Sequence, residues 1–322
     1  MLHAASPILA LVCAWVLVAL AMPATIARLR RNGLVQIVRK EGPSAHLAKQ
    51  GTPMAAGMLF VAAGSLAAWA FASRDWALAA AIVVTLGHAG LGFADDYLKV
   101  VRRRPEGLIA RYKLVGQVAL ALFLAGFALA AKPAALDLRI PLSAGRLVLG
   151  PASFVVLVLV AVLGASNGAN FTDGADGLLA STGAVALGVL GVLSWIGGER
   201  GLATLALGLV GGLAGFLAWN WHPARVFMGD TGSMALGAAF AAIGVLGGWT
   251  LYLPIIGLLF VLEVLSVIVQ VGYYRLTGRR LLRMAPLHHH LELSGWREGR
   301  LVPRLLAFAL VCGAVGVAIY FR

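Results

Sequence analysis

The chain has 322 residues, of which 61% are hydrophobic and 12% are charged, and its mean hydropathy is +0.90. This composition excludes a soluble globular protein, which needs a more polar surface. The formal net charge of +13 fits basic loops beside anionic lipids, or an anionic substrate such as a nucleotide diphosphate. Nucleic acid is not an expected partner, because the basic segments are short and alternate with apolar ones.

Apolar segments of roughly 18–20 residues, long enough to cross a bilayer core of about 30 Å, recur along the whole chain. We therefore predict an all-α polytopic membrane protein whose residues 1–322 form a single integral-membrane domain. About ten transmembrane helices are expected, at approximately 4–22, 54–73, 76–94, 113–131, 151–169, 178–196, 201–219, 233–248, 250–271 and 304–321.

Most of the 26 basic residues fall in loops 23–50, 95–113 and 272–304. Because basic loops stay on the cytoplasmic side, both termini are expected outside the cytoplasm, and the polar motifs described below are expected on the cytoplasmic face. The outward loop at about 132–150 has the pattern of a small exterior β-hairpin.

The first polar motif, GFADDYLKV at 92–100, places Asp95 and Asp96 at the end of a predicted span, with Lys99 one helical turn away. A carboxylate at a membrane boundary is costly and usually functional. Adjacent carboxylates suit a divalent cation or a shared proton, and hard oxygen ligands favour Mg²⁺. The alternative is a pair of helix-end carboxylates satisfied by Lys99 and Arg102.

The second motif, NGANFTDGADGL at 167–178, spaces Asn167, Asn170, Asp173 and Asp176 three residues apart. This spacing places them along one helix face or clusters them in a tight glycine-rich turn. The helix expected from about residue 178 would offer its N-terminus to an anion. An ordinary turn with one aspartate as helix N-cap is the alternative, but it explains only one of the four residues.

The third motif, FMGDTGS at 227–233, carries Asp230, and Asn220 lies ten residues upstream. A helix N-cap is the alternative interpretation of Asp230.

In the fourth polar cluster, PLHHHLE at 286–292, three consecutive histidines cannot all reach one metal ion from regular structure. They are better suited to binding phosphate or sugar, or to proton transfer. Glu263, inside a predicted span, is interpreted as structural in preference to catalytic.

These motifs, in this order, resemble those of the polyprenyl-phosphate N-acetylhexosamine-1-phosphate transferase superfamily. The residues that carry the resemblance are GFADDYLKVVRRRPEGLIARYK, SNGANFTDGADGL, NWHPARVFMGDTGSMALG and RMAPLHHHLELSGWREGRLVPR, together with HLAKQGTP near 46–53. The PLHHHLE and GW segments point within it to the phospho-N-acetylmuramoyl-pentapeptide-transferases. One departure is TPMAAG at 52–57, where the family usually reads TPTMGG. A hydroxyl and a glycine are replaced, and Met54 therefore puts polar contacts in that loop in doubt.

The resemblance implies a bacterial cytoplasmic (inner) membrane enzyme that transfers phospho-N-acetylmuramoyl-pentapeptide from its UDP conjugate to undecaprenyl phosphate. The products would be lipid I and UMP, in the first membrane step of peptidoglycan synthesis, with Mg²⁺ as cofactor and a homodimer as the assembly. Whether an aspartate first forms a covalent intermediate stays open.

The resemblance also implies roles for individual residues. Asp230 would bind Mg²⁺, with Asp95, Asp96 and Asn170 as further candidate ligands. The expected catalytic residues are Asp95, Asp96, Asp230 and His289. The expected substrate contacts are Lys49, Thr52, Lys99, Lys113, Asn167, Asn170, Asp173, Asp176, Asn220, Phe227, Gln270, His288 and His290.

Three other functions are weighed against this one. A sister transferase for UDP-N-acetylglucosamine would differ in the histidine cluster. A transporter would place its carboxylates near the bilayer midplane, often in inverted repeats, whereas these gather at one face and no such repeat is detected. A membrane scaffold gives no reason for the spaced Asn and Asp residues.

Overall fold

The computed structural model describes residues 2–36, 49–73, 75–104, 106–143 and 145–321. Arg39, Lys40, Arg74 and the first part of HLAKQGTP lie outside them. Within the described residues, nine helices are long and apolar enough to cross a membrane. They are α1 (Leu2–Arg31), α3 (Trp76–Val100), α4 (Ala110–Ala131), α5 (Pro151–Thr172), α6 (Leu178–Ile196), α7 (Arg200–Asn220), α8 (Gly229–Leu246), α10 (Leu258–Thr277) and α12 (Glu298–Tyr320).

A shorter apolar helix, α2 (Gly57–Phe71), lies at the place of the second expected span. Many large apolar side chains of the helices are exposed, including Leu20, Val160 and Leu310. An apolar outer surface of this kind is suited to lipid and not to water. The prediction of an all-α polytopic membrane protein is therefore confirmed.

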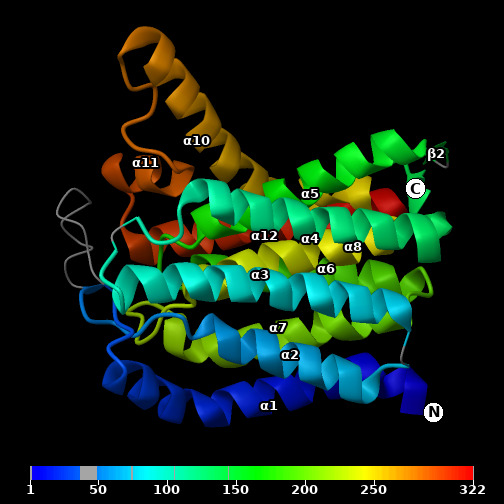
Figure 1. Cartoon of the computed structure of the whole chain (residues 1–322), viewed down its shortest axis with the longest axis horizontal. Coiled ribbons are helices and arrows are strands. Elements are labelled where there is room, and N and C mark those ends of the chain that lie inside the picture. Colours follow the sequence, from blue (N-terminus) through cyan, green and yellow to red (C-terminus); the bar gives the residue numbers. More distant parts are fainter. Residues whose placement is uncertain (1, 37–48, 74, 105, 144, 322) are drawn as a thin grey trace.

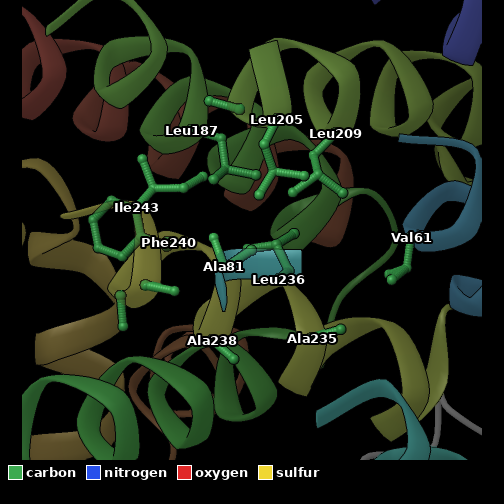
Figure 2. Packing of buried hydrophobic residues seen from close by; sticks show 14 of the residues in the cluster. Val61, Ala81, Leu187, Leu205, Leu209, Ala235, Leu236, Ala238, Phe240 and Ile243 are labelled. Carbon is green, nitrogen blue, oxygen red and sulfur yellow. The ribbon is translucent and has the colours of Figure 1, made fainter. Parts of the chain in front are cut away.

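Most of the helices lie side by side along one direction, and α10 leans away from the others (Figure 1). Helix α8 is the core of the bundle, since every one of its residues except Asp230 is buried. It packs against α3 and α5, while α7 packs against α1, α2 and α6. Figure 2 shows Leu236, Phe240 and Ile243 of α8 facing leucines of α6 and α7.

The close contact between α3 and α8 depends on a glycine. A β-carbon at Gly92 would lie 2.1 Å from the carbonyl oxygen of Asp230, so no larger residue fits there. No hydrophobic effect drives helices together in lipid, so they associate through close packing. Small residues allow this close approach. The glycine of the GFADD motif thus brings its two aspartates against the start of α8.

The expected single span at 250–271 is wrong in detail. This segment is divided into a 3-10 helix, η3 (Thr250–Tyr252), the short helix α9 (Leu253–Ile256) and a break at Gly257 before α10. Pro254 lies in the first turn of α9, where its missing N–H costs nothing, and a proline starts a helix more readily than it continues one. Helix α10 in turn extends to Thr277, beyond the expected end.

The expected hairpin in the 132–150 loop is confirmed. After the 3-10 helix η2 (Pro133–Leu136), β1 (Asp137–Arg139) pairs antiparallel with β2 (Arg146–Val148). Both ends of the chain lie at this hairpin end of the bundle, and α11 (Leu287–Leu293) lies at the opposite end (Figure 1). The two termini are therefore on one side, as predicted.

Candidate active site

The aspartates of the first and third motifs form one cluster. Asp95 and Asp96 lie in the last turns of α3, and Asp230 lies in the first turn of α8. One carboxylate oxygen of each lies within 4.8 Å of the others, close enough to share a metal ion. Asp95 and Asp96 are buried, whereas Asp230 is partly open.

Asp96 anchors the beginning of α8. Its carboxylate accepts hydrogen bonds from the backbone N–H groups of Asp230, at 3.1 Å, and Thr231, at 3.0 Å, and from the Thr231 hydroxyl at 2.6 Å. The first N–H groups of a helix lack partners inside the helix. The N-cap residue, Met228, provides no side-chain cap. The side chain of Asp96, from α3, therefore caps the start of α8, and Asp230 is not an N-cap.

Two lysines surround Asp230. Lys113 Nζ, from the first turn of α4, lies 2.7 Å from its Oδ2, and Lys99 Nζ lies 3.2 Å from the same oxygen. Lys99 also pairs with Asp95, whose other oxygen accepts the Leu108 N–H at 2.9 Å. The cluster therefore combines three carboxylates with two ammonium groups, a set that can hold a cation and also neutralise a phosphate.

Asn170, at the end of α5, joins this cluster. With its amide nitrogen directed to Asp230 Oδ1 and Ser233 Oγ, both at 3.2 Å, its oxygen accepts from Lys113 Nζ at 3.2 Å. Asn167, one turn earlier, instead donates to Gln117 Oε1 at 3.2 Å and to the Leu163 carbonyl. That contact joins α5 to α4, so the structure brings Asn170 to the aspartates but not Asn167.

Asp173 immediately follows α5. Burial raises the pKa of its carboxyl well above the usual range, and the nearby negative charges of Asp230 and Asp96 raise it further. The turn after α5 thus places a further carboxyl near the first cluster.

A second cluster forms around Lys49, whose Nζ lies 2.8 Å from Asp176 Oδ1 and 2.7 Å from Glu298 Oε1. His222 Nδ1 and the Ala224 N–H both lie 3.0 Å from Asp176 Oδ2. Burial alone would raise the pKa of Asp176, but the hydrogen bond and charge of Lys49 outweigh it and hold the pKa below its usual value. The same contacts raise the pKa of Lys49 against the opposing effect of burial.

Asn220 and Phe227 border this second cluster. Asn220 Oδ1 accepts the Gly177 N–H at 3.1 Å, and its Nδ2 donates to the Val226 carbonyl at 2.9 Å, so it fixes two loops. Lys49 Nζ lies 5.9 Å from the centre of the Phe227 ring.

The side chain of Asp176 pairs with Lys49, and the N-cap of α6 is Gly177. Asp176 is therefore not a helix cap.

The TPMAAG segment contacts the FMGD motif through its backbone. The Phe227 N–H donates to the Pro53 carbonyl at 2.8 Å, and the Ala56 N–H donates to the Phe227 carbonyl at 3.2 Å. Met54 is buried, and its N–H donates to the Leu34 carbonyl. Thr52 begins the segment, and its carbonyl accepts the Gln36 N–H at 2.8 Å. Main-chain groups make these contacts. The presence of Met54 where the family has Thr therefore removes none of them.

The three histidines have three different partners. His288 is buried against Glu263, with its Nδ1 3.2 Å from the carboxylate. His289 Nδ1 lies 2.8 Å from Glu292 Oε2, and His290 Nδ1 accepts the Arg283 N–H at 3.2 Å. The expectation that they do not share one ion fits these contacts.

His288 also contacts the second motif. A β-carbon at Gly174 would lie 2.0 Å from His288 Nε2, so the glycine lets this nitrogen approach the turn that carries Asp173. Gln270, in contrast, satisfies the backbone of Leu281 and Leu282 with its amide. Its described hydrogen bonds do not reach either carboxylate cluster.

Sequence reasoning missed Glu298 and His222, which complete the second cluster, and the hydroxyl of Thr231, which binds Asp96. The only available signal for Glu298 was its place in the GWREGRLVPR segment, just before the last expected span.

Known proteins resemble this chain over most of its length. The model of glycosyl transferase family 4 matches residues 78–248, a segment that includes all three aspartates of the first cluster. The phospho-N-acetylmuramoyl-pentapeptide-transferase of Carboxydothermus hydrogenoformans is 46% identical over 284 residues, 86% of each chain. The protein of the same name from Geobacillus sp. (strain WCH70) is 40% identical over 322 residues, 97% of each chain.

This chain belongs to the phospho-N-acetylmuramoyl-pentapeptide-transferase family. In this member of the phospho-N-acetylmuramoyl-pentapeptide-transferase family, two groups of described residues could hold a metal ion, namely Asp95 with Asp96 and Asp230, and Asp176 with His222 and Glu298.

Proposed function

We propose that this integral membrane enzyme transfers phospho-N-acetylmuramoyl-pentapeptide from its UDP conjugate to undecaprenyl phosphate, giving lipid I and UMP. The observation that carries the proposal is the meeting of Asp95, Asp96 and Asp230 with Lys99 and Lys113 at one end of the bundle. A diphosphate substrate needs this combination of cation ligands and positive side chains.

Mg²⁺ is the proposed cofactor, and Asp230 its first ligand, with Asp95, Asp96 and Asn170 beside it. The carboxylate oxygens of the three aspartates are close enough to share one ion, and hard oxygen donors suit Mg²⁺ better than a soft metal. When bound, the ion would neutralise charge on the diphosphate. The first group offers three carboxylates, whereas the second includes the imidazole of His222, so the first group suits Mg²⁺ better.

The proposed reaction is an attack by a phosphate oxygen of the lipid on the β-phosphorus of the sugar nucleotide. The new bond joins that oxygen to phosphorus, and the bond from phosphorus to the bridging oxygen breaks, so both bonding electrons leave with UMP. Lys99 and Lys113 would stabilise the extra negative charge. Asp95 would accept a proton from the lipid phosphate, and His288, His289 and His290 would contact the sugar or the diphosphate.

We place Lys49, Asp176, Asn220 and Phe227 around the nucleotide, together with Asp173. An aromatic ring, an amide and charged groups in one place suit a nucleotide. The assignments of Thr52, Asn167 and Gln270 as substrate contacts remain predictions.

We also propose that the chain is one domain in the bacterial cytoplasmic membrane, with this end of the bundle facing the cytoplasm, and that it forms a homodimer. The basic loops and the single bundle of helices support the orientation and the single domain. The family resemblance supports the homodimer.

The test is UMP release by purified protein in detergent with undecaprenyl phosphate and Mg²⁺, comparing two sugar nucleotides. Release with UDP-N-acetylmuramoyl-pentapeptide alone supports the proposal. Release with UDP-N-acetylglucosamine alone would assign the chain to the sister transferases. No release from folded protein would contradict an enzymatic function and support transport.

A further inference from the structure

Glu298 is the first residue of α12, and its side chain reaches into the second cluster. Its Oε1 accepts a hydrogen bond from Lys49 Nζ at 2.7 Å and from the backbone N–H of Asp176 at 2.6 Å. Its Oε2 lies 3.6 Å from His222 Nδ1. One carboxylate thus contacts three segments that are far apart in the sequence.

Each of these contacts holds a part of the proposed nucleotide site. Lys49 lies in the connection between α1 and α2, Asp176 lies in the turn between α5 and α6, and His222 follows α7. The side chain of Glu298 is 13% exposed and that of Lys49 is 15% exposed, so water screens their attraction only in part. The ammonium group of Lys49 lies between the carboxylates of Asp176 and Glu298, which together fix its position.

We propose that Glu298 is a positioning residue for the sugar-nucleotide substrate, because its carboxylate holds Lys49 and the Asp173–Asp176 turn in the geometry that receives the nucleotide. This inference rests on the proposed function, which places Lys49 and Asp176 at the nucleotide. Glu298 is not a catalytic residue, since its contacts are with protein groups and not with the reacting phosphates.

The contacts separate two parts of this role. Glu298→Gln keeps an oxygen that can accept the Asp176 N–H but removes the charge that attracts Lys49. Glu298→Ala removes both contacts and leaves the N–H of a buried turn without its partner. Loss of the carboxylate should therefore weaken the site in two steps, with the alanine variant the more affected.

The experiment measures kcat and both KM values for purified wild type, Glu298→Gln and Glu298→Ala. We expect KM for UDP-N-acetylmuramoyl-pentapeptide to rise several-fold in the glutamine variant and at least about tenfold in the alanine variant. The KM for undecaprenyl phosphate and the kcat should both stay within about twofold of wild type. Equilibrium binding of UMP should weaken in the same order, which gives a readout without turnover.

Glu199→Gln is the matched control. Glu199 precedes α7, at the end of that helix opposite to Asn220, and pairs with Lys132 at 2.5 Å, so it tests the loss of a partly buried Lys–Glu pair away from the site. We expect its kinetic constants to equal those of wild type. The double variant Lys49→Met with Glu298→Ala should be less impaired than the product of the two single effects, because one contact is shared.

Wild-type values of KM and UMP binding in both Glu298 variants would overturn this inference while leaving the proposed function intact. So would a fall in kcat with KM unchanged. If Glu298→Ala does not fold, the glutamine variant decides by the same criteria. Absence of turnover by folded wild type with the muramoyl substrate would instead overturn the proposed function.

Discussion

The buried carboxylate of Glu263 lies 3.2 Å from Nδ1 of His288 and also accepts the backbone N–H of the same histidine. A carboxylate there favours the imidazole tautomer with its proton on Nδ1, which leaves Nε2 as an acceptor facing Gly174. A glutamate inside a membrane helix thus positions the first histidine of the PLHHHLE motif.

Replacing Glu263 by Gln should therefore lower turnover without unfolding the protein. An amide keeps the shape of the side chain but no longer favours one tautomer of His288. We expect kcat to fall at least about tenfold, or about 1.4 kcal/mol of activation free energy. The melting temperature in detergent should stay near that of wild type. Full turnover by Glu263→Gln would show that the contact serves packing alone.

The hydroxyl of Thr231 should contribute to stability. Thr231→Val keeps the volume of the side chain but removes a buried hydrogen bond of 2.6 Å to Asp96. The expected loss is about 1–3 kcal/mol of unfolding free energy, measured as a lower melting temperature in detergent. Thr231→Ser retains the hydroxyl and should recover most of it. Equal melting temperatures for the Val and Ser variants would show that the Thr231 hydroxyl adds nothing to the contact with Asp96.

The transfer should proceed in one step, without a phospho-sugar attached to an aspartate. Asp96 already accepts three hydrogen bonds, which make a carboxylate a weaker nucleophile, and Asp95 is proposed to act as the base. Labelled UMP should therefore not exchange into the sugar nucleotide when the lipid acceptor is absent. Exchange at a rate comparable to turnover would establish a covalent intermediate.

The Lys49–Asp176 pair should stabilise the protein across the neutral pH range. The folded-state pKa of Asp176 lies below its usual value, so its contribution is present above about pH 4 and is lost as pH falls through the folded pKa. The pKa of Lys49 is raised, so its contribution is lost only as pH rises past about 10.

The difference in melting temperature between wild type and Lys49→Met should accordingly stay constant from about pH 5 to about pH 9. Thermal unfolding in detergent at several pH values measures it. A difference that vanishes near pH 7 would show that the pair is not held in its charged form.

The sequence was enough to predict the membrane-spanning, all-α architecture. The motifs that carry Asp95, Asp96 and Asp230 end or begin long apolar segments, so alternation of the spans was enough to place them on one face. Their shared role at one centre came only from the family resemblance. The hairpin was predictable because a Ser-Ala-Gly turn separates two strand-like runs in the 132–150 loop.

The partners of these residues could not be predicted in the same way. The contact of Lys113 with Asp230 depends on how α4 is rotated about its axis, and the contact of Glu298 with Lys49 joins residues 249 positions apart. Helix rotation and long-range contacts follow from the packing of the whole bundle, which hydropathy does not encode. The break at Gly257 was hidden because its flanking residues are apolar.

Asp230 provides the most direct test of the proposed centre. We would measure UMP release from UDP-N-acetylmuramoyl-pentapeptide and undecaprenyl phosphate by wild type, Asp230→Ala and the control Glu199→Gln, with Mg²⁺ and with EDTA. We predict release by wild type and Glu199→Gln with Mg²⁺, none with EDTA, and none by folded Asp230→Ala under either condition. Wild-type turnover by Asp230→Ala, or turnover unaffected by EDTA, would contradict a metal-dependent centre at Asp230.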